Sequence, residues 1–208
     1  MIIHDMEQGT EEWLRVRMGK VTASNFAISM AKGKSGGVSK TRTTLMHKLI
    51  AERLTNEPQE TYRNGAMEWG TETEPAAREY YEAVNDCIVK EVGFVEHNEY
   101  IGCSPDGLVS EDGLLEIKCP NSATHIGYIL ADKLPAVYKA QVQGQLWVTD
   151  RKWCDFVSYD PRVSKRPYWF IRVNRDQDYI DKLECAVGDF ATDMQIIIKQ
   201  LTESQFVG

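Results

Sequence analysis

Two short stretches of this sequence decide most of what can be predicted about its fold: Ser104-Pro105-Asp106-Gly107-Leu108 and, one turn later, Leu115-Glu116-Ile117-Lys118-Cys119-Pro120. The first predicts a tight Pro-Asp-Gly turn, and the second predicts an apolar strand. Side chains two residues apart on a strand share a face, so Glu116 and Lys118 point one way while their apolar neighbours point the other. A carboxylate and an ammonium are therefore aimed at the same place.

A strand face that carries a Glu and a Lys is costly to bury unless something charged lies against it, and a divalent metal or a phosphate would meet that need. Each feature alone has an ordinary alternative. Asp106 is common turn chemistry, the Glu116 and Lys118 pair resembles a solvated edge strand, and Glu74 could cap a helix. Their combination favours a functional site.

The bulk properties predict one globular domain over residues 1–208. The chain is 42% hydrophobic and long enough to close its own core. Its five cysteines are odd in number and contain no Cys-x-x-Cys pair, which argues against a disulfide framework or a zinc ribbon. No signal pattern or membrane-spanning apolar run is apparent. We expect a soluble protein in a reducing cytoplasm, without a membrane partner.

The formal net charge of −7 argues by itself against a nucleic-acid partner, but the distribution of charge matters more. No acidic residue lies between Arg15 and Lys48, and this basic stretch includes Lys34 in a Gly-rich loop. Two interpretations stand equal here. The stretch either holds a phosphate backbone or is a solvated flexible loop.

Patterns along the chain predict helices and strands in a mixed arrangement. Pro75 suits a first helical turn, which would put Glu74 at the mouth of a helix. The order of elements predicts an α/β (α+β) fold with a central mixed β-sheet flanked by helices. Another helix is predicted to start at Thr10-Glu11-Glu12-Trp13-Leu14. The other predicted helices lie near residues 44–54, 135–148 and from about 176 onward, and the predicted strands are 88–95, 100–103, 108–109, 114–118, 153–159 and 168–173.

The carboxylates suit a hard divalent cation such as Mg²⁺, which prefers oxygen ligands and keeps several waters. Asp106, Glu116 and the backbone carbonyl of Ile117 would hold one metal beside a scissile phosphate. Lys118 would position or deprotonate the attacking water. Glu74 is the natural extra ligand if the site holds two metals.

The Pro-Asp and Glu-x-Lys arrangement resembles the PD-(D/E)XK nuclease superfamily, and its surroundings resemble the phage lambda-type exonucleases, or YqaJ-like viral recombinases. The likeness covers nearly the whole chain. It is carried, besides the two stretches above, by residues 13–24, Trp69-Gly70-Thr71-Glu72-Thr73-Glu74, Ala140-Gln141-Val142-Gln143, Leu146-Trp147-Val148-Thr149 and Tyr159-Asp160-Pro161-Arg162.

The resemblance implies a Mg²⁺-dependent exonuclease, with Mn²⁺ as a substitute, that digests one strand of linear duplex DNA from the 5′ end. It would release mononucleotides and leave a 3′ single strand. Gln141 would support the metal site, a choice over the nearby Gln143 and Gln145 that rests on the family's Ala-Gln-Val-Gln. Arg17, Ser24 and Ser104 match the positions that anchor the 5′-phosphate, which suits a guanidinium and hydroxyls; the alternative for Arg17 is a surface helix charge.

The same resemblance implies a homotrimeric ring around DNA, a single-strand annealing protein as partner, and a phage or prophage origin in a bacterial host cytoplasm. The loop around Lys34 would approach the duplex. Two alternatives stay open. The same three side chains would serve a PD-(D/E)XK endonuclease, and the fold could belong to a non-catalytic scaffold that binds DNA ends.

Overall fold

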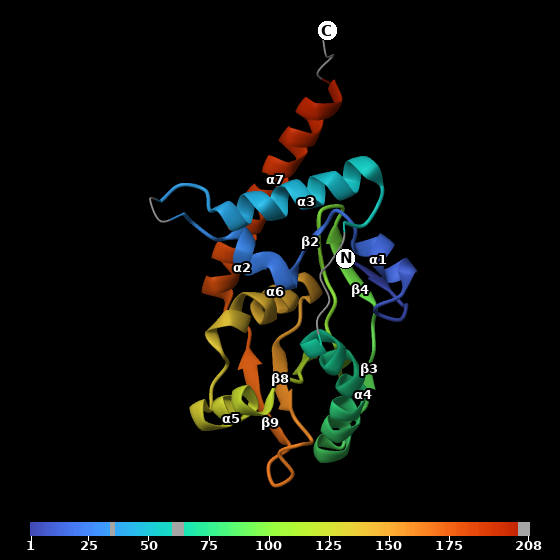
Figure 1. Ribbon diagram of the computed structural model, residues 1–208, viewed down its shortest axis with the longest axis vertical. Helices are drawn as coiled ribbons and strands as arrows, with labels where there is room; N and C mark the ends of the chain where they lie inside the picture. The colour runs from blue at the N-terminus through green and yellow to red at the C-terminus, as the bar shows by residue number, and fades with distance from the viewer. Residues whose placement is uncertain (34–35, 60–64, 204–208) are drawn as a thin grey trace.

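The strands form two sheets rather than the single sheet expected (Figure 1). The structure is a computed structural model that describes residues 1–33, 36–59 and 65–203. One sheet has four strands in the order β1-β4-β5-β2, and the other has five in the order β3-β6-β7-β8-β9. The bounds are β1 Ile2–His4, β2 Val21–Thr22, β3 Val89–Lys90, β4 Phe94–Asn98, β5 Ile101–Cys103, β6 Gly107–Val109, β7 Gly113–Lys118, β8 Trp153–Tyr159 and β9 Tyr168–Asn174.

The chain changes sheets at Gly93. The strand predicted over residues 88–95 is split there, so that β3 pairs with β6 while β4 pairs with β1 and β5. A side chain at Gly93 would lie 2.5 Å from the carbonyl oxygen of Met6, so only glycine permits this close backbone approach. The predicted meander of antiparallel strands is therefore divided between two sheets.

Strand β7 lies at the centre of the larger sheet and carries the predicted site residues Glu116 and Lys118. It runs antiparallel to β6 and parallel to β8, and β9 closes the sheet antiparallel to β8. The pairing with β6 covers only the first half of β7, since Gly107 pairs with Leu115 and β6 has no residue opposite Glu116 or Lys118. The last half of β7 is therefore open on that side.

The two faces of β7 enter two separate hydrophobic cores, as the predicted alternation requires. Leu114 belongs to the larger core, which helices α2, α3, α6 and α7 surround. Leu115 and Ile117 belong to a smaller core beneath helix α4, where they meet Ala77 and Tyr81. Glu116 and Lys118 therefore face the α6 side of the sheet, opposite to α4.

Helix α4 begins earlier than predicted. It runs over Gly65–Asn85 and contains Pro75 in its interior, so Glu74 lies within the helix and not at its mouth. Proline at this point disfavours a helix because it lacks an N–H donor. Thr73, Ala77 and Tyr81 are buried at a spacing of four residues, and this packing stripe stabilises the helix across the proline.

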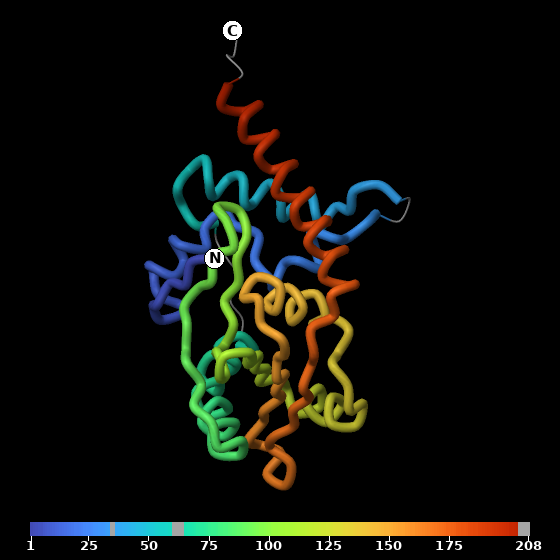
Figure 2. Tube along the Cα trace, turned by 180° about the vertical axis from the view of Figure 1, so that it is seen from behind, coloured from blue at the N-terminus to red at the C-terminus, as the bar shows by residue number. Residues whose placement is uncertain are grey.

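The remaining helices follow the predictions with several differences, among them the unpredicted short segments η1 and α2. Helix α5, whose Asn121 cap accepts a hydrogen bond from the Thr124 backbone N–H, was not predicted. The helix predicted from Pro135 begins as a 3₁₀ turn, η2, before α6. The last helix, α7, packs against α2, α3 and α6, and its end extends beyond the body of the fold (Figure 2). The bounds are α1 Glu11–Arg17, η1 Ala23–Asn25, α2 Phe26–Ser29, α3 Lys40–Thr55, α5 Ser122–Ala131, η2 Ala136–Tyr138, α6 Lys139–Thr149 and α7 Gln177–Glu203.

In the part of the chain that the structure describes, no helix is both long enough and apolar enough to cross a membrane.

Candidate active site

Glu116 is a buried carboxylate with three donors around it. Its side chain is 1% exposed. Gln141 donates from Nε2 to Glu116 Oε1 at 2.6 Å, and Gln145 donates from Nε2 to Oε2 at 2.6 Å. The third donor is the Lys118 ammonium, which forms an ion pair with Oε1. Two neutral amides and one cation therefore satisfy a charge that would be costly to bury alone.

Lys118 forms the outer side of this pair. Its side chain is 27% exposed, and its Nζ lies 5.4 Å from the ring centroid of Tyr138. Burial lowers the pKa of the ammonium, but the carboxylates of Glu116 and Asp106 and the hydrogen bond to Glu116 raise it more, so the pKa lies above its ordinary value. Lys118 is therefore a protonated donor in this state.

Asp106 reaches the open side of β7 from the turn that precedes β6. Its Oδ2 accepts a hydrogen bond from the Ile117 backbone N–H at 2.6 Å. The N–H and C=O of one strand residue point to the same side, so the Ile117 carbonyl also faces the side that β6 leaves open. Burial and the charges of Glu116 and Glu74 raise the pKa of Asp106 well above its ordinary value. Carboxylates held this close together favour a cation.

Glu74 approaches from α4 and is 34% exposed. Arg78 donates to Glu74 Oε1 at 2.8 Å and also pairs with Glu91 at 2.7 Å. Burial raises the pKa of Glu74, while the charges of Arg78 and Lys118 lower it. Glu74 thus lies within electrostatic reach of Lys118 but is bonded to its own helix.

The oxygen donors at this site fit a hard divalent cation, although they would supply only part of its coordination shell. Within residues 1–33, 36–59 and 65–203, no three His, Cys, Asp or Glu side chains form a ready-made metal-binding group. Asp106, Glu116 and the Ile117 carbonyl offer two carboxylates and one carbonyl. Mg²⁺ accepts such a partial set because it keeps several of its waters. The chemistry of the oxygens therefore fits the predicted metal, with Glu74 on a separate element.

Gln145 also bonds to Glu116, although only Gln141 was predicted to support the metal site. Residues four apart on a helix share a face, so Gln141 and Gln145 both reach Glu116 from α6. Gln143 points elsewhere and bonds to Asn174 and Asp176. The Gln145 Oε1 is buried and has no hydrogen-bond partner among the described residues. The four-residue spacing between Gln141 and Gln145 could have indicated from the sequence that both side chains reach the site.

Arg17 and Ser104 form a second small polar site. Arg17 NH1 lies 3.4 Å from Ser104 Oγ, and its guanidinium stacks 3.9 Å from the Trp13 ring centroid. Trp13 Nε1 in turn donates to Ser104 Oγ at 3.0 Å. Burial lowers the pKa of Arg17 to about 10, with Cys103 and Glu52 opposing the shift. In the described part of the chain no carboxylate forms an ion pair with Arg17, so it offers an unneutralised charge to an anion.

Ser24 lies close to this second site along the backbone. Strand β2 pairs with β5 in parallel, with Thr22 opposite Gly102. Ser24 follows in the 3₁₀ turn η1, which ends this strand pairing but still packs against β5. Ser24 is exposed, and its Oγ lies 3.1 Å from Thr22 Oγ1. No contact between Ser24 and Arg17 is among those that the structure describes.

The two sites are neighbours. Cys103 ends β5 directly before Ser104, and its pKa is raised by burial and by the charge of Glu116, while the charge of Arg17 lowers it. The charges of Glu116 in the first site and Arg17 in the second therefore both act on the Cys103 thiol. Ser104 also lies two residues before Asp106, so the second site adjoins the first along the chain.

The basic N-terminal stretch is partly neutralised by acids from other elements. Lys20 pairs with Glu96 at 3.7 Å, and Arg42 pairs with Asp193 at 2.7 Å. Lys34, predicted to approach the duplex, lies outside the described residues. The basic stretch therefore stays a prediction as a DNA contact.

The comparisons with known proteins address the family directly. A model of the YqaJ-like viral recombinase domain matches residues 12–152. This chain belongs to that family. The match covers Arg17, Glu74, Asp106, Glu116, Lys118 and Gln141, and it confirms the resemblance drawn from the sequence.

Solved structures of exonucleases share the fold of this YqaJ-like domain. The alkaline exonuclease LHK-Exo from Laribacter hongkongensis is 42% identical, with a TM-score of 0.86 over 93% of this chain and 96% of that chain. The complex of LHK-Exo with dAMP gives a TM-score of 0.85 at the same identity, over 92% and 96% of the two chains. A phage-related exonuclease from Haemophilus somnus 129PT has a TM-score of 0.69 at 20% identity, covers 88% and 96% of the two chains, and supports the fold alone.

A viral relative is much longer. The uncharacterized protein R354 of Acanthamoeba polyphaga mimivirus is 29% identical over 170 residues, which is 74% of this chain. The chain spans 29% of the length of that protein.

Proposed function

We propose that this chain is a divalent-cation-dependent exonuclease that digests one strand of linear double-stranded DNA from its 5′ end. It releases mononucleotides and leaves a 3′ single strand for annealing recombination. The observation that carries this proposal is the group at the open end of β7. Buried Glu116 pairs with Lys118 there, and Asp106 bonds the backbone between them. The 42% identity to an alkaline exonuclease supports the same reaction class.

Asp106, Glu116 and the Ile117 carbonyl would hold Mg²⁺, with Mn²⁺ as a substitute. When bound, the cation would supply Lewis-acid stabilisation of the phosphate charge and lower the pKa of a coordinated water. Glu74 would serve a second cation, or complete the set for the first, from its place on α4. These assignments rest on the oxygen donors and on the electrostatic reach between Glu74, Glu116 and Asp106.

The side chains around the cation have separate tasks. Gln141 and Gln145 hold the Glu116 carboxylate in one orientation. Lys118, partly exposed at the mouth of the site, holds the attacking water or a phosphate oxygen with its ammonium. Water attacks the phosphorus, the bond to the 3′ oxygen breaks, and a nucleoside 5′-monophosphate leaves. The remaining strand again begins with a 5′-phosphate.

Arg17, Ser104 and Ser24 would bind that terminal 5′-phosphate. A planar guanidinium and two hydroxyls are suitable donors for phosphate oxygens. Because this site neighbours Glu116, a phosphate bound there places the next phosphodiester near Lys118. Binding of dAMP by the related LHK-Exo supports a mononucleotide product here. This arrangement favours cleavage at ends over cleavage at internal positions.

The assembly and partner remain proposals from the family resemblance. We propose a homotrimeric ring around the duplex, a single-strand annealing protein as partner, and action in a bacterial cytoplasm for a phage or prophage. A viral recombinase family supports the last point. The ring would explain processive digestion, because a closed ring cannot leave DNA sideways.

The test is digestion of a linear duplex with a 5′-phosphate and a label on one strand, in Mg²⁺ or EDTA. Closed circular plasmid and the Lys118→Ala protein are the controls. We expect metal-dependent loss of the 5′-phosphorylated strand, intact circles and no activity from the variant.

Discrete internal cuts in the plasmid would make the chain an endonuclease instead. Complete absence of cleavage, with retained binding to DNA ends, would make it a scaffold. Both results would contradict the proposal.

A further inference from the structure

An ion pair between a buried carboxylate and a half-exposed guanidinium lies where the loop between β8 and β9 begins. Asp160 follows β8 and its side chain is 0% exposed. Arg162 donates from Nε to Asp160 Oδ1 at 2.7 Å and from NH2 to Oδ2 at 3.0 Å. Ser122 at the start of α5 donates to Oδ2 at 2.6 Å. A bidentate pair with a further hydroxyl fixes the guanidinium in one plane.

The same guanidinium contacts two other segments of the chain. Its NH2 donates to the Pro120 carbonyl at 3.2 Å, two residues beyond Lys118. Its Cζ lies 4.1 Å from the ring centroid of Trp69, on α4. Trp69 stands on the same helix as Glu74. Arg162 therefore joins the end of β8, the chain after β7 and the helix that carries the third carboxylate.

This junction lies at the catalytic edge of the sheet. Strands β7 and β8 are parallel, with Lys118 opposite Ser158, so their carboxyl ends meet at one edge. Cys119 and Pro120 follow β7 at this edge and Asp160 follows β8 there, so the two segments that Arg162 joins leave the sheet on the same side.

We infer that Arg162 is a positioning residue for the proposed metal site: by joining Asp160, Pro120 and Trp69, it fixes α4 and Glu74 relative to Asp106 and Glu116. The inference rests on the proposed function. Two points carry it. Glu74 reaches the site from an element separate from the strand residues, and Arg162 directly links that element to the chain that leaves the catalytic strand. Partners behind metal ligands typically change metal affinity or activity about 10- to 100-fold when removed.

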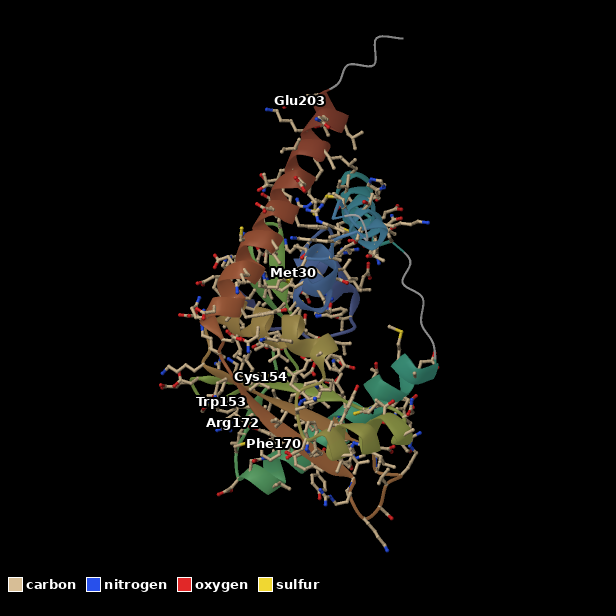
Figure 3. All side chains as sticks on the ribbon, turned by 90° about the vertical axis from the view of Figure 1, so that its left-hand side faces the viewer. Met30, Trp153, Cys154, Phe170, Arg172 and Glu203 are labelled. Atoms are coloured by element: carbon tan, nitrogen blue, oxygen red, sulfur yellow. The ribbon has the colours of Figure 1, made fainter. Side chains whose placement is uncertain are left out.

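The sheet offers a matched control in Arg172. Arg172 donates from Nε and NH2 to the buried Asp155 at 2.8 and 2.9 Å, and its Cζ lies 3.7 Å from the ring centroid of Trp153. Figure 3 labels Arg172 and Trp153, which lie side by side on β9 and β8. The chemistry matches that of Arg162, but the helix residue that bonds to this pair is Tyr81, two turns beyond Glu74.

The test measures Mn²⁺ binding directly by electron paramagnetic resonance of free Mn²⁺. The proteins are the wild type, Arg162→Ala, Arg162→Lys and Arg172→Ala, each first shown to be folded by circular dichroism. We expect Arg162→Ala to bind Mn²⁺ about tenfold more weakly or worse, with Arg162→Lys between it and the wild type. Arg172→Ala should bind Mn²⁺ like the wild type although its melting temperature falls.

Nuclease kinetics supply a second readout. The Mg²⁺ concentration that gives half-maximal activity should rise for Arg162→Ala, while the rate at saturating Mg²⁺ returns to within about threefold of the wild type. Loss of general stability would not produce this separation.

Trp69→Leu keeps the Asp160 and Arg162 pair intact but removes the contact with α4, so it decides the question even if Arg162→Ala does not fold. It should weaken Mn²⁺ binding in the same direction. Folded Trp69→Leu and Arg162→Lys proteins that bind Mn²⁺ within twofold of the wild type would overturn the inference, as would equal weakening by Arg172→Ala. A wild type that binds no Mn²⁺ and digests no DNA would overturn the proposed function as well.

Discussion

Two buried carboxylates on neighbouring strands are satisfied in different ways. Glu116 on β7 is 1% exposed and Asp155 on β8 is 0% exposed. Asp155 receives both arms of the Arg172 guanidinium and the hydroxyl of Tyr81 at 2.7 Å. Glu116 receives two neutral amides and the ammonium of Lys118, which is itself partly exposed.

The difference separates a structural carboxylate from the one proposed to act in catalysis. A bidentate guanidinium fully neutralises Asp155 and leaves it no capacity for another cation. Two neutral amides orient Glu116, and its one cationic partner, Lys118, pairs with Oε1 alone. The kind of donor therefore says more about the role of a buried carboxylate than its burial does.

The largest effect should follow from breaking the functional side of this comparison. Glu116→Gln or Lys118→Ala should lower the nuclease rate by about 1000-fold, because the first removes the charge of a proposed metal ligand and the second removes the ammonium that would hold the water or a phosphate oxygen. Thermal melts should show both variants folded. Substantial residual cleavage by both folded proteins would remove Glu116 and Lys118 from the reaction.

Breaking the structural side should affect stability and not chemistry. Arg172→Ala leaves the Asp155 charge buried with only Tyr81, so we expect a loss of about 3 kcal/mol in the free energy of unfolding. Urea titration measures this loss, and the nuclease rate per folded molecule should stay unchanged. A variant as stable as the wild type would mean that the Asp155 carboxylate does not need the Arg172 guanidinium to stay buried.

Removing an amide donor sharpens the comparison. Gln145→Leu should lower metal affinity or activity by about 10- to 100-fold, since Glu116 would lose one of the groups that orient it. Gln143→Leu is the matched control on the same helix and bonds away from Glu116. Activity assays over a range of Mg²⁺ concentrations distinguish the two, and equal effects would count against a specific role for Gln145.

The smallest effect concerns the second donor to Asp155. Tyr81→Phe removes one hydrogen bond to a charged group while Arg172 stays in place, so the free energy of unfolding should fall by about 1.5 kcal/mol. Urea titration measures it, and a double variant with Arg172→Ala tests whether the two donors act independently. Activity should not change.

Local patterns were sufficient where one element decides the outcome. The alternation of Leu115, Glu116, Ile117 and Lys118 predicted which side chains share a face, and the structure confirms it through the two hydrophobic cores. The family match confirms the resemblance drawn from the same residues.

Long-range pairing could not be predicted in this way. The division into two sheets depends on the close approach at Gly93, and the true start of α4 was hidden because Pro75 resembles a first helical turn. The junction of Arg162 with Trp69 joins residues far apart in the chain, so no local spacing signals it. Gln145 differs from these features, because its four-residue spacing from Gln141 can be read directly from the sequence.

Strand β7 continues beyond its neighbour β6, and this has a consequence for how such sites evolve. Because β6 ends its pairing at Leu115, the peptide group of Ile117 is left to Asp106 on one side. A carbonyl oxygen of the main chain is supplied by whatever residue occupies the position. Mutation at Ile117 can vary the packing against α4 while the oxygen persists, so part of this site is inherited through the shape of the backbone and leaves no mark in an amino-acid alignment.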